Sequence, residues 1–280
     1  MNDDAVLYSK HSNLQKSDAA YILDKYSNLL NWRDGDKILD VGAGEGSVSI
    51  EVLLPRLPTN FHKLTLSDIS PQMLKFAQER CEDSRLDCLL MDISVVVPES
   101  LHQQFDHIFS FYCLQWVADE NRQEQAWKNI FDLLKPGGDT LVTIIATGPL
   151  FDFSESMAKM EKWAPFMGNV KRVISPYHHI ENPADKLKNF LEKTGFLVKV
   201  CETEERCYVY SSTSQFLDWG FSVNPFIKTL PENERPSFIE EYKRQVFTHK
   251  KIIVEKGDNG GEKIHKMYTM LTACASKPLY

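Results

Sequence analysis

The sequence lacks the patterns of disulfide-stapled, zinc-binding, membrane-spanning and nucleic-acid-binding proteins. Its six cysteines, at positions 81, 88, 113, 201, 207 and 274, form no Cys-x-x-Cys pair and no close cysteine–histidine spacing. We therefore expect reduced thiols and no metal. No segment approaches the ~20 consecutive apolar residues that span a bilayer. The net charge is −7, from 32 Lys and Arg against 39 Asp and Glu, which argues against binding to nucleic-acid phosphates.

The remaining composition is that of an ordinary folded chain. Of its 280 residues, 42% are hydrophobic and 25% are charged, so the chain can bury a sizeable core. The acidic beginning of the sequence is not followed by an apolar segment, so we expect no secretory signal and a cytoplasmic location. No interface can be identified from the pattern, which leaves a homodimer open.

Short apolar runs alternate with amphipathic segments through the first half of the chain. A helix is expected up to Leu30, with Ser17 as its N-cap. Such alternation predicts an α/β fold with a doubly wound, mostly parallel sheet. The expected strands are 37–41, 61–66, 86–91, 105–110 and 140–145, and the helices lie after the glycine turn at 42–46 up to Pro55, and at 71–81 and 120–134.

The second half of the chain has a less regular pattern, and it predicts a helical cover over the sheet. We expect one domain over residues 1–280, with a ligand-binding core at 36–147 and covering elements at 1–30 and about 150–250. Residues 150–180 are expected to be irregular. Beyond them we expect helices at 183–193, 213–221 and 231–246, strands at 196–201 and 264–275, and a turn at 256–262.

A glycine-rich turn follows the first predicted strand. Gly42, Gly44 and Gly46 precede a helix, where small residues allow a ligand to approach the backbone and the free N–H groups of the helix. Ser47 occupies the position after the third glycine, so the spacing is G-x-G-x-G rather than the G-x-G-x-x-G of dinucleotide-binding proteins. This difference disfavours a nicotinamide or flavin cofactor.

Acidic residues end the next two predicted strands. Asp68 lies 22 residues beyond Gly46, where a carboxylate can accept hydrogen bonds from ribose hydroxyls, and Asp92 follows the third strand. Each of these residues alone is equally explained as a helix cap or a turn. A Leu-Lys-Pro-Gly-Gly turn at 134–138 then precedes the fifth strand.

In this order, these motifs resemble the seven-stranded S-adenosylmethionine-dependent methyltransferases. The resemblance implies a seven-stranded sheet with an antiparallel last strand, S-adenosylmethionine as cofactor, S-adenosylhomocysteine as product and no metal. It places the glycine turn beside the methionine part of the cofactor, the acid after strand two on the ribose and the acid after strand three on the adenine. The implied cofactor-binding residues are Asp40, Gly42, Gly44, Asp68, Ile69, Asp92, Ile93 and Ser110.

Segments 7–15, 109–117 and 174–178 are similar to the insect juvenile hormone acid O-methyltransferases. That resemblance implies methylation of farnesoic acid or juvenile hormone acid to methyl farnesoate or juvenile hormone. It also implies that the Gln15 amide and the Trp116 indole orient the substrate carboxylate. A carboxylate is already ionised at neutral pH, so it needs no general base, and neutral N–H donors orient it without strongly stabilising its charge.

An isoprenoid substrate needs an apolar pocket. We expect residues of both covering segments, 1–30 and about 150–250, to line it. Aromatic and aliphatic side chains are also ordinary core residues, and we expect fewer than half of those in the late cover to touch ligand. The adjacent His178 and His179 are interpreted as solvated or structural, because no carboxylate spacing completes a metal site. The expected pocket residues are Tyr8, His11, Trp163, Phe166, Met167, Ile174, Tyr177, Trp219, Phe221 and Phe226.

Three other functions remain open at this stage. A methyltransferase of the same fold could act on another small-molecule acid, hydroxyl compound or amine. A noncatalytic isoprenoid carrier could retain the glycine turn as a scaffold, although the intact set of Gly42, Gly44, Asp68 and Asp92 disfavours it. A nicotinamide-dependent oxidoreductase is disfavoured by the glycine spacing.

Overall fold

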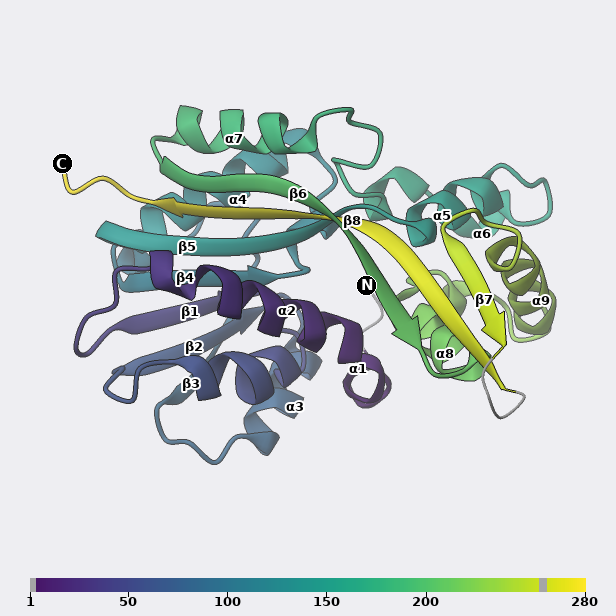
Figure 1. Cartoon of the computed structure of the whole chain (residues 1–280), viewed down its shortest axis with the longest axis horizontal. Coiled ribbons are helices and arrows are strands. Elements are labelled where there is room, and N and C mark those ends of the chain that lie inside the picture. Colours follow the sequence, from purple (N-terminus) through teal and green to yellow (C-terminus); the bar gives the residue numbers. More distant parts are fainter. Residues whose placement is uncertain (1–3, 257–260) are drawn as a thin grey trace.

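A twisted sheet runs through the whole of the computed structural model, which describes residues 4–256 and 261–280 (Figure 1). Its strand order is β3-β2-β1-β4-β5-β8-β6, and β7 pairs with the outer part of β8. The strands are β1 (Lys37–Val41), β2 (Lys63–Asp68), β3 (Leu86–Leu90), β4 (Phe105–Phe111), β5 (Leu134–Thr147), β6 (Leu197–Tyr210), β7 (Ile252–Lys256) and β8 (Glu262–Ser276).

The strand directions confirm the predicted doubly wound, mostly parallel sheet. β3, β2, β1, β4 and β5 pair in parallel, whereas β8 is antiparallel to β5, β6 and β7. The antiparallel last strand is therefore as expected, but the number of strands is not. The described residues form eight strands rather than seven, because β7 was missed. Its sequence is Ile-Ile-Val-Glu-Lys, which does not alternate apolar and polar residues, and only Ile252 is buried.

Helices cover both faces of the sheet, and successive strand residues point to opposite sides of it. On β4, Phe109 belongs to the apolar core that contains residues of α2, and Ile108 belongs to the core that contains residues of α4 and α7. The helices in the described residues are α1 (Ala5–His11), α2 (Asn13–Tyr26), α3 (Pro71–Arg80), α4 (Glu120–Leu133), α5 (Pro149–Ala158), α6 (Ala164–Met167), α7 (Pro183–Thr194), α8 (Thr213–Val223) and α9 (Arg235–Val246).

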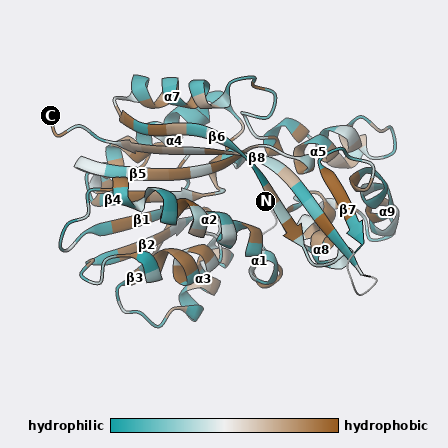
Figure 2. Cartoon of the chain, viewed as in Figure 1, coloured by the Kyte–Doolittle hydropathy of each residue, from teal (hydrophilic) through white to brown (hydrophobic). Residues whose placement is uncertain are grey.

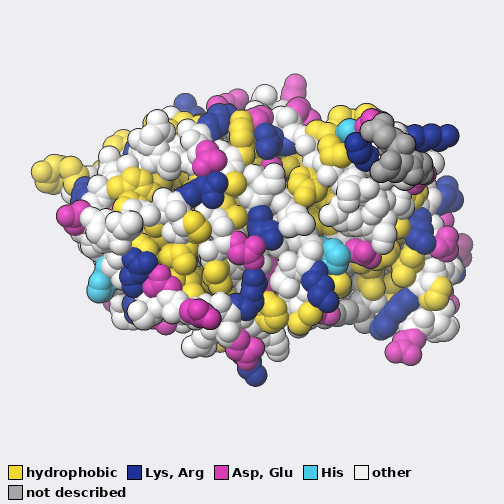
Figure 3. Space-filling view, turned by 60° about the horizontal axis from the view of Figure 1, so that its bottom comes forward, with side chains coloured by type: hydrophobic (Ala, Val, Ile, Leu, Met, Phe, Trp, Pro, Cys, Tyr) yellow, Lys and Arg dark blue, Asp and Glu magenta, His cyan; other side chains and the backbone are white. Residues whose placement is uncertain are grey.

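The long strands β6 and β8 extend beyond the parallel sheet and carry the cover. Their outer ends lie among α5, α8, α9 and β7, at the right of Figure 1. The expected strand at 196–201 is thus only the first part of β6, and the expected irregular region 150–180 contains α5 and α6. Hydrophilic and hydrophobic bands alternate along α2 and α7 (Figure 2), as in helices with one face on a core. Acidic and basic side chains are interspersed on the face drawn in Figure 3.

The N-terminal helix begins differently from the prediction. Ser17 lies inside α2 and is not its N-cap. An additional helix, α1, precedes it, and the Asp4 carboxylate accepts a hydrogen bond from the Leu7 N–H at 3.0 Å to cap that helix. The pattern of α1 was missed because Ala5 is its one buried residue.

Two other segments refine the prediction. The helix expected after the glycine turn is a π-helical turn, Ser49–Leu53, followed by a 3-10 turn, Leu54–Arg56, and it ends where Pro55 suggested. Part of the turn expected at 256–262 lies outside the described residues.

Among the described helices, none has the length and apolar character needed to cross a membrane.

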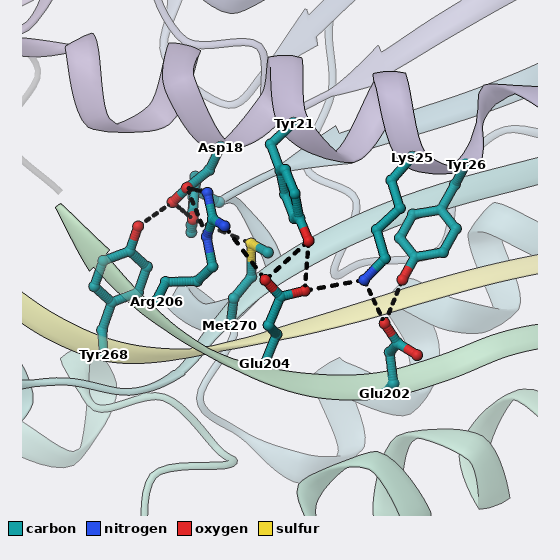
Figure 4. Close-up of polar contacts among 10 residues, drawn as sticks. Asp18, Tyr21, Lys25, Tyr26, Glu202, Glu204, Arg206, Tyr268 and Met270 are labelled. Atoms are coloured by element: carbon teal, nitrogen blue, oxygen red, sulfur yellow. Dashed lines mark hydrogen bonds and ion pairs between the residues drawn. The ribbon is translucent and has the colours of Figure 1, made fainter.

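A buried carboxylate on α2 joins this helix to the sheet (Figure 4). Asp18 is 1% exposed, and its Oδ2 accepts hydrogen bonds from the hydroxyls of Tyr112, just after β4, and Tyr268 on β8. Arg206 on β6 donates to Asp18 Oδ1 from Nη2 at 3.1 Å and from Nε at 3.3 Å. Three elements distant in the sequence therefore converge on one carboxylate.

A second set of contacts continues along the same helix (Figure 4). The Tyr21 hydroxyl donates to Glu204 at 2.9 Å, and Lys25 Nζ lies 2.9 Å from Glu202 and 3.0 Å from Glu204. These partners are on β6, so α2 is fixed over several turns against one strand.

Replacing Asp18 tests how far this junction stabilises the fold. Asp18→Ala leaves Arg206 and two buried hydroxyls without their shared acceptor, so we expect the free energy of unfolding to fall by about 3 kcal/mol. Urea denaturation measures this change. Asp24→Ala, on the same helix, is the control, because its ion pair with Arg56 is exposed and should contribute little. Equal effects of the two substitutions would contradict the assignment.

Candidate active site

A cavity of about 840 Å³ lies at the carboxyl ends of β1, β2, β3 and β4. This is the edge where parallel α/β sheets bind ligands. Residues that follow each of the four strands line it, and so do residues of α1, α2 and the segment after α6. They include Tyr8, Gln15, Asp40, Gly42, Gly44, Asp68, Ile69, Asp92, Ile93 and Trp116, all of which the sequence singled out.

The glycine turn is held tightly against its neighbours. Gly42 has φ +72°, and a Cβ at this position would lie 2.2 Å from Cys113 Sγ, so no larger residue fits without rearrangement. Gly44 has φ +59°, and a Cβ added there would have no neighbouring atom within 4 Å. The first glycine thus permits close packing of the turn, and the second leaves its cavity side open to a ligand.

The acidic residues are ordered by hydrogen bonds around this turn. Asp68 Oδ2 accepts from the Gly44 N–H and Oδ1 from the Ser70 N–H, both at 2.9 Å. Asp92 accepts from Ser94 N–H at 2.9 Å and forms an ion pair with Arg122 at 3.1 Å. Both carboxylates are therefore fixed at the cavity wall.

Asp40 lies deeper than these two carboxylates. Its Oδ2 accepts a hydrogen bond from the Ser49 hydroxyl at 2.6 Å. Burial raises the pKa of Asp40 to about 7, the hydrogen bond from Ser49 opposes this shift, and the nearby Asp68 adds to it. The protein thus carries a buried acid at the wall of the main cavity, and its charge changes near neutral pH.

Gln15 and Trp116 come from distant parts of the chain and line the same cavity. Gln15 is buried on α2, and its Nε2 donates to the Tyr8 hydroxyl at 3.1 Å, which leaves a second N–H on this amide. Trp116 ends the 3-10 turn Leu114–Trp116 after β4. No residue in the described part of the chain accepts a hydrogen bond from its indole N–H. Both side chains therefore have N–H groups free for a ligand.

The hydroxyl and thiol groups around these donors are protonated. Burial raises the pKa of Tyr8, Tyr112 and Cys113 above their ordinary values. Among the described residues, no histidine lines the cavity. The groups next to Gln15 and Trp116 are therefore neutral donors, which suit an acceptor that is already ionised.

A second, smaller cavity adjoins the first. It measures about 20 Å³ and shares Tyr8, Gln15, Tyr112 and Trp116 with the main cavity. We call it the inner cavity. Its other walls are mostly apolar and come from β5, the start of α5, α8 and β8: Ile145, Gly148, Leu150, Phe151, Trp219, Val223 and Lys266, together with Gln115.

The structure separates the predicted pocket residues into two groups. Tyr8 and Trp219 line one or both of these two cavities, whereas the others line neither of them. Trp163, Phe166, Met167 and Phe226 pack together in a separate apolar cluster, Ile174 and Tyr177 are buried, Phe221 packs near Tyr242, and His11 is half-buried. Ser110 also lies outside both cavities, since its hydroxyl donates to the Val41 carbonyl at 2.9 Å behind the glycine turn.

Sequence reasoning missed several cavity residues. Lys171 and Arg172 line the main cavity from the segment after α6, where no periodic pattern marks them. Lys266 lines the inner cavity, and the sequence pattern of its strand could have identified it. On β8, Ile264, Lys266, Tyr268 and Met270 alternate as inward-facing positions, so a lysine in this series is a buried charge.

The adjacent histidines have carboxylate partners that the sequence spacing did not reveal. His178 lies 3.1 Å from Asp152, and His179 lies 2.8 Å from Glu155, both carboxylates being on α5. Ligand atoms of Glu155, His178 and His179 lie within 4.8 Å of one another, and His249 also pairs with Asp152. The hydrogen bonds among these groups join α5 to the segment that follows α6.

Several known proteins are similar to this chain in sequence. A family model described as a methyltransferase domain matches residues 38–138. The juvenile hormone acid O-methyltransferase of Bombyx mori is 34% identical over 263 residues, which cover 94% of this chain and 92% of that protein. The protein of the same name from Drosophila melanogaster is 32% identical, with 98% of this chain and 92% of that protein covered.

A solved structure shows the same fold at lower identity. The phosphoethanolamine N-methyltransferase 2 of Haemonchus contortus, in complex with S-adenosyl-L-methionine, is 20% identical, with a TM-score of 0.52. The alignment covers 94% of this chain and 52% of that protein. This structural similarity also confirms the expected fold class.

The position of Asp68 predicts a selective loss of cofactor affinity. Asp68→Ala removes a carboxylate acceptor from the cavity wall, so we expect the Kd for S-adenosylmethionine to rise at least ~10-fold. Turnover at saturating cofactor should change much less. Isothermal titration calorimetry and steady-state kinetics separate the two effects. Asp83→Ala, outside both cavities, is the control, and normal cofactor binding by Asp68→Ala would refute the assignment.

The raised pKa of Asp40 predicts a pH dependence of cofactor binding. The carboxyl group is ionised above about pH 7 and becomes protonated below it, so its attraction for a cationic cofactor is lost as the pH falls. Between pH 8 and pH 6 we expect affinity for S-adenosylmethionine to weaken by up to ~10-fold. Asp40→Asn should bind more weakly and with a flatter pH profile. An unchanged slope in this variant would assign the titration to another group.

Proposed function

The chain belongs to the family of S-adenosylmethionine-dependent O-methyltransferases that includes the juvenile hormone acid O-methyltransferases, and from this premise we propose that it esterifies an isoprenoid carboxylic acid. The proposed substrates are farnesoic acid and its epoxide, juvenile hormone acid. Their methyl esters are methyl farnesoate and juvenile hormone.

One observation supports this proposal most directly. Gln15 and Trp116 have unused N–H groups in the same cavity as the open side of Gly44. A carboxylate has two acceptor oxygens, and the two donors come from different elements, so each can receive one oxygen. In the proposed mode, Gln15 and Trp116 orient the carboxylate toward the glycine turn.

The neutrality of the two donors matters for the reaction. An ion pair with Arg or Lys would stabilise the carboxylate strongly and make its oxygen a poorer nucleophile. A neutral amide and indole fix the oxygen without this cost. Because charge is neutralised in the transition state, this chain contributes positioning and exclusion of water rather than proton transfer.

The residues at the main cavity suit S-adenosylmethionine. When bound, this cofactor supplies the methyl group as an electrophile. Gly44 leaves space for its approach, Asp68 and Asp92 provide acceptors, and Ile93 provides an apolar surface. Ile69 is 65% exposed at the rim, where a bound adenosine would cover it.

A substrate panel tests the proposed function. Transfer of labelled methyl from S-adenosylmethionine is measured with farnesoic acid, juvenile hormone acid, a saturated fatty acid, an isoprenoid alcohol and an isoprenoid amine. We expect base-labile ester from the two isoprenoid acids. Labelling of the alcohol or the amine instead would contradict a carboxylate site at Gln15 and Trp116.

Trp116→Phe isolates the contribution of the indole N–H. The ring is kept but the donor is removed, so we expect kcat/KM for the acid to fall roughly 10- to 100-fold while cofactor affinity is unchanged. Trp32→Phe is the matched control, because the Trp32 N–H donates to the Ser27 carbonyl and the residue lines neither cavity. Equal loss of activity and cofactor binding would identify Trp116 as a structural residue.

A further inference from the structure

Lys266 carries a buried amine that forms no hydrogen bond with the described residues. It is 2% exposed on β8, and its Nζ lies 4.0 Å from the ring centroid of Trp219 and 4.4 Å from that of Tyr268. Within the described part of the chain, no group forms a hydrogen bond or an ion pair with this Nζ. The Asp18 carboxylate acts on it electrostatically, but its oxygens are already shared by Tyr112, Tyr268 and Arg206.

Burial of an unpaired amine is unfavourable, so a buried, unpaired lysine suggests that a ligand supplies its partner. Burial lowers the pKa of Lys266 to about 7, while the two aromatic faces favour the protonated form. Both protonation states keep N–H donors. The side chain therefore has donor capacity that the fold leaves unused, and it lines the inner cavity.

The inner cavity places this amine in relation to the reaction site. Gln15, Trp116, Lys266 and Trp219 all line this cavity. The indole N–H of Trp219 is also buried and unpaired. Leu150, Phe151 and Val223 provide apolar surface in the same cavity. A substrate that extends from the carboxylate donors into this space would meet both apolar surface and a second polar group.

We propose that Lys266 donates a hydrogen bond to an uncharged oxygen of the substrate, remote from its carboxylate, and so selects for oxygenated isoprenoid acids. The inference rests on the function proposed above. Among the proposed substrates, the epoxide oxygen of juvenile hormone acid is such an acceptor, and farnesoic acid lacks it.

The unused groups on this wall define the kind of atom that binds there. Lys266 Nζ and Trp219 Nε1 are both donors, so they complement an ether-type oxygen that has lone pairs and no proton. A carboxylate would be held more strongly by the amine, but this pairing would lower the nucleophilicity of its oxygen. A division of roles follows, with Gln15 and Trp116 at the carboxylate and Lys266 at the distant oxygen.

The size of the inner cavity adds a physical requirement. At about 20 Å³ it holds about one water molecule, which is far smaller than an isoprenoid chain. Entry of the chain therefore requires its apolar walls to move apart. Most of those apolar walls come from α5 and α8, which belong to the cover, and Ile145 on β5 adds to them.

The test compares two substrates that differ by one oxygen. Initial rates of ester formation give kcat/KM for juvenile hormone acid and farnesoic acid, with wild type, Lys266→Met and Lys266→Gln. Methionine keeps the length and removes the donor. We expect Lys266→Met to lower the ratio of the two kcat/KM values, epoxide over farnesoic acid, by roughly 10- to 100-fold. Lys266→Gln, which keeps an N–H donor, should give an intermediate ratio.

Controls separate the possible failures. Lys263→Met changes an exposed lysine of the same strand and should leave the ratio unaltered. Cofactor affinity reports whether each variant is folded. An unchanged ratio in both Lys266 variants, whether activity falls or is retained, would overturn the proposal. Absence of ester from both acids with wild-type protein would instead refute the proposed function, and this inference with it.

Discussion

The carboxylate of Asp18 is the constraint on which the arrangement of the site depends. It lies one helical turn after Gln15 and accepts hydrogen bonds from Tyr112, four residues before Trp116. Tyr112 has φ +58°, a backbone conformation that a non-glycine residue rarely adopts, and its hydroxyl is fixed by Asp18. Arg206 and Tyr268 join the same carboxylate from β6 and β8. One buried anion therefore sets the position of the N-terminal helix relative to the segment after β4, and with it the separation of the two proposed carboxylate donors.

This geometry suits a methyl acceptor that needs no proton removed. The Gln15 and Trp116 donors are neutral, the surrounding hydroxyls and thiol have raised pKa values, and Asp68 and Asp92 follow the second and third strands, where the proposal puts the cofactor. An ionised acceptor needs orientation and a dry environment more than proton transfer. The cationic groups in the two cavities, including Lys171, Arg172 and Lys266, then serve other purposes than holding the reacting carboxylate, and Lys266 is the one for which the structure suggests a specific ligand atom.

The sequence predicted the parallel half of the molecule well because local signals there agree with one another. β1 and α3 match closely because an apolar run ends at a glycine turn in one case and Ser70 and Pro71 begin a helix in the other. The cover was predicted poorly. From the sequence, its apolar residues are equally compatible with a core and with a pocket. Only tertiary packing shows that Trp163 and Met167 belong to a separate cluster and that Trp219 lines a cavity. The hydrogen bonds around Asp18 could not be predicted for a similar reason. Asp18, Tyr112, Arg206 and Tyr268 are far apart in the chain and follow no common spacing.

A structure of the protein with S-adenosylhomocysteine and farnesoic acid would test the central claim most directly. The account predicts that the substrate carboxylate lies between α2 and the segment after β4, with one oxygen about 3 Å from Gln15 Nε2 and the other about 3 Å from Trp116 Nε1. It also predicts that the Asp18 hydrogen bonds persist in the complex. A carboxylate bound instead to Lys171, Arg172 or Lys266, with Gln15 and Trp116 out of contact, would contradict it.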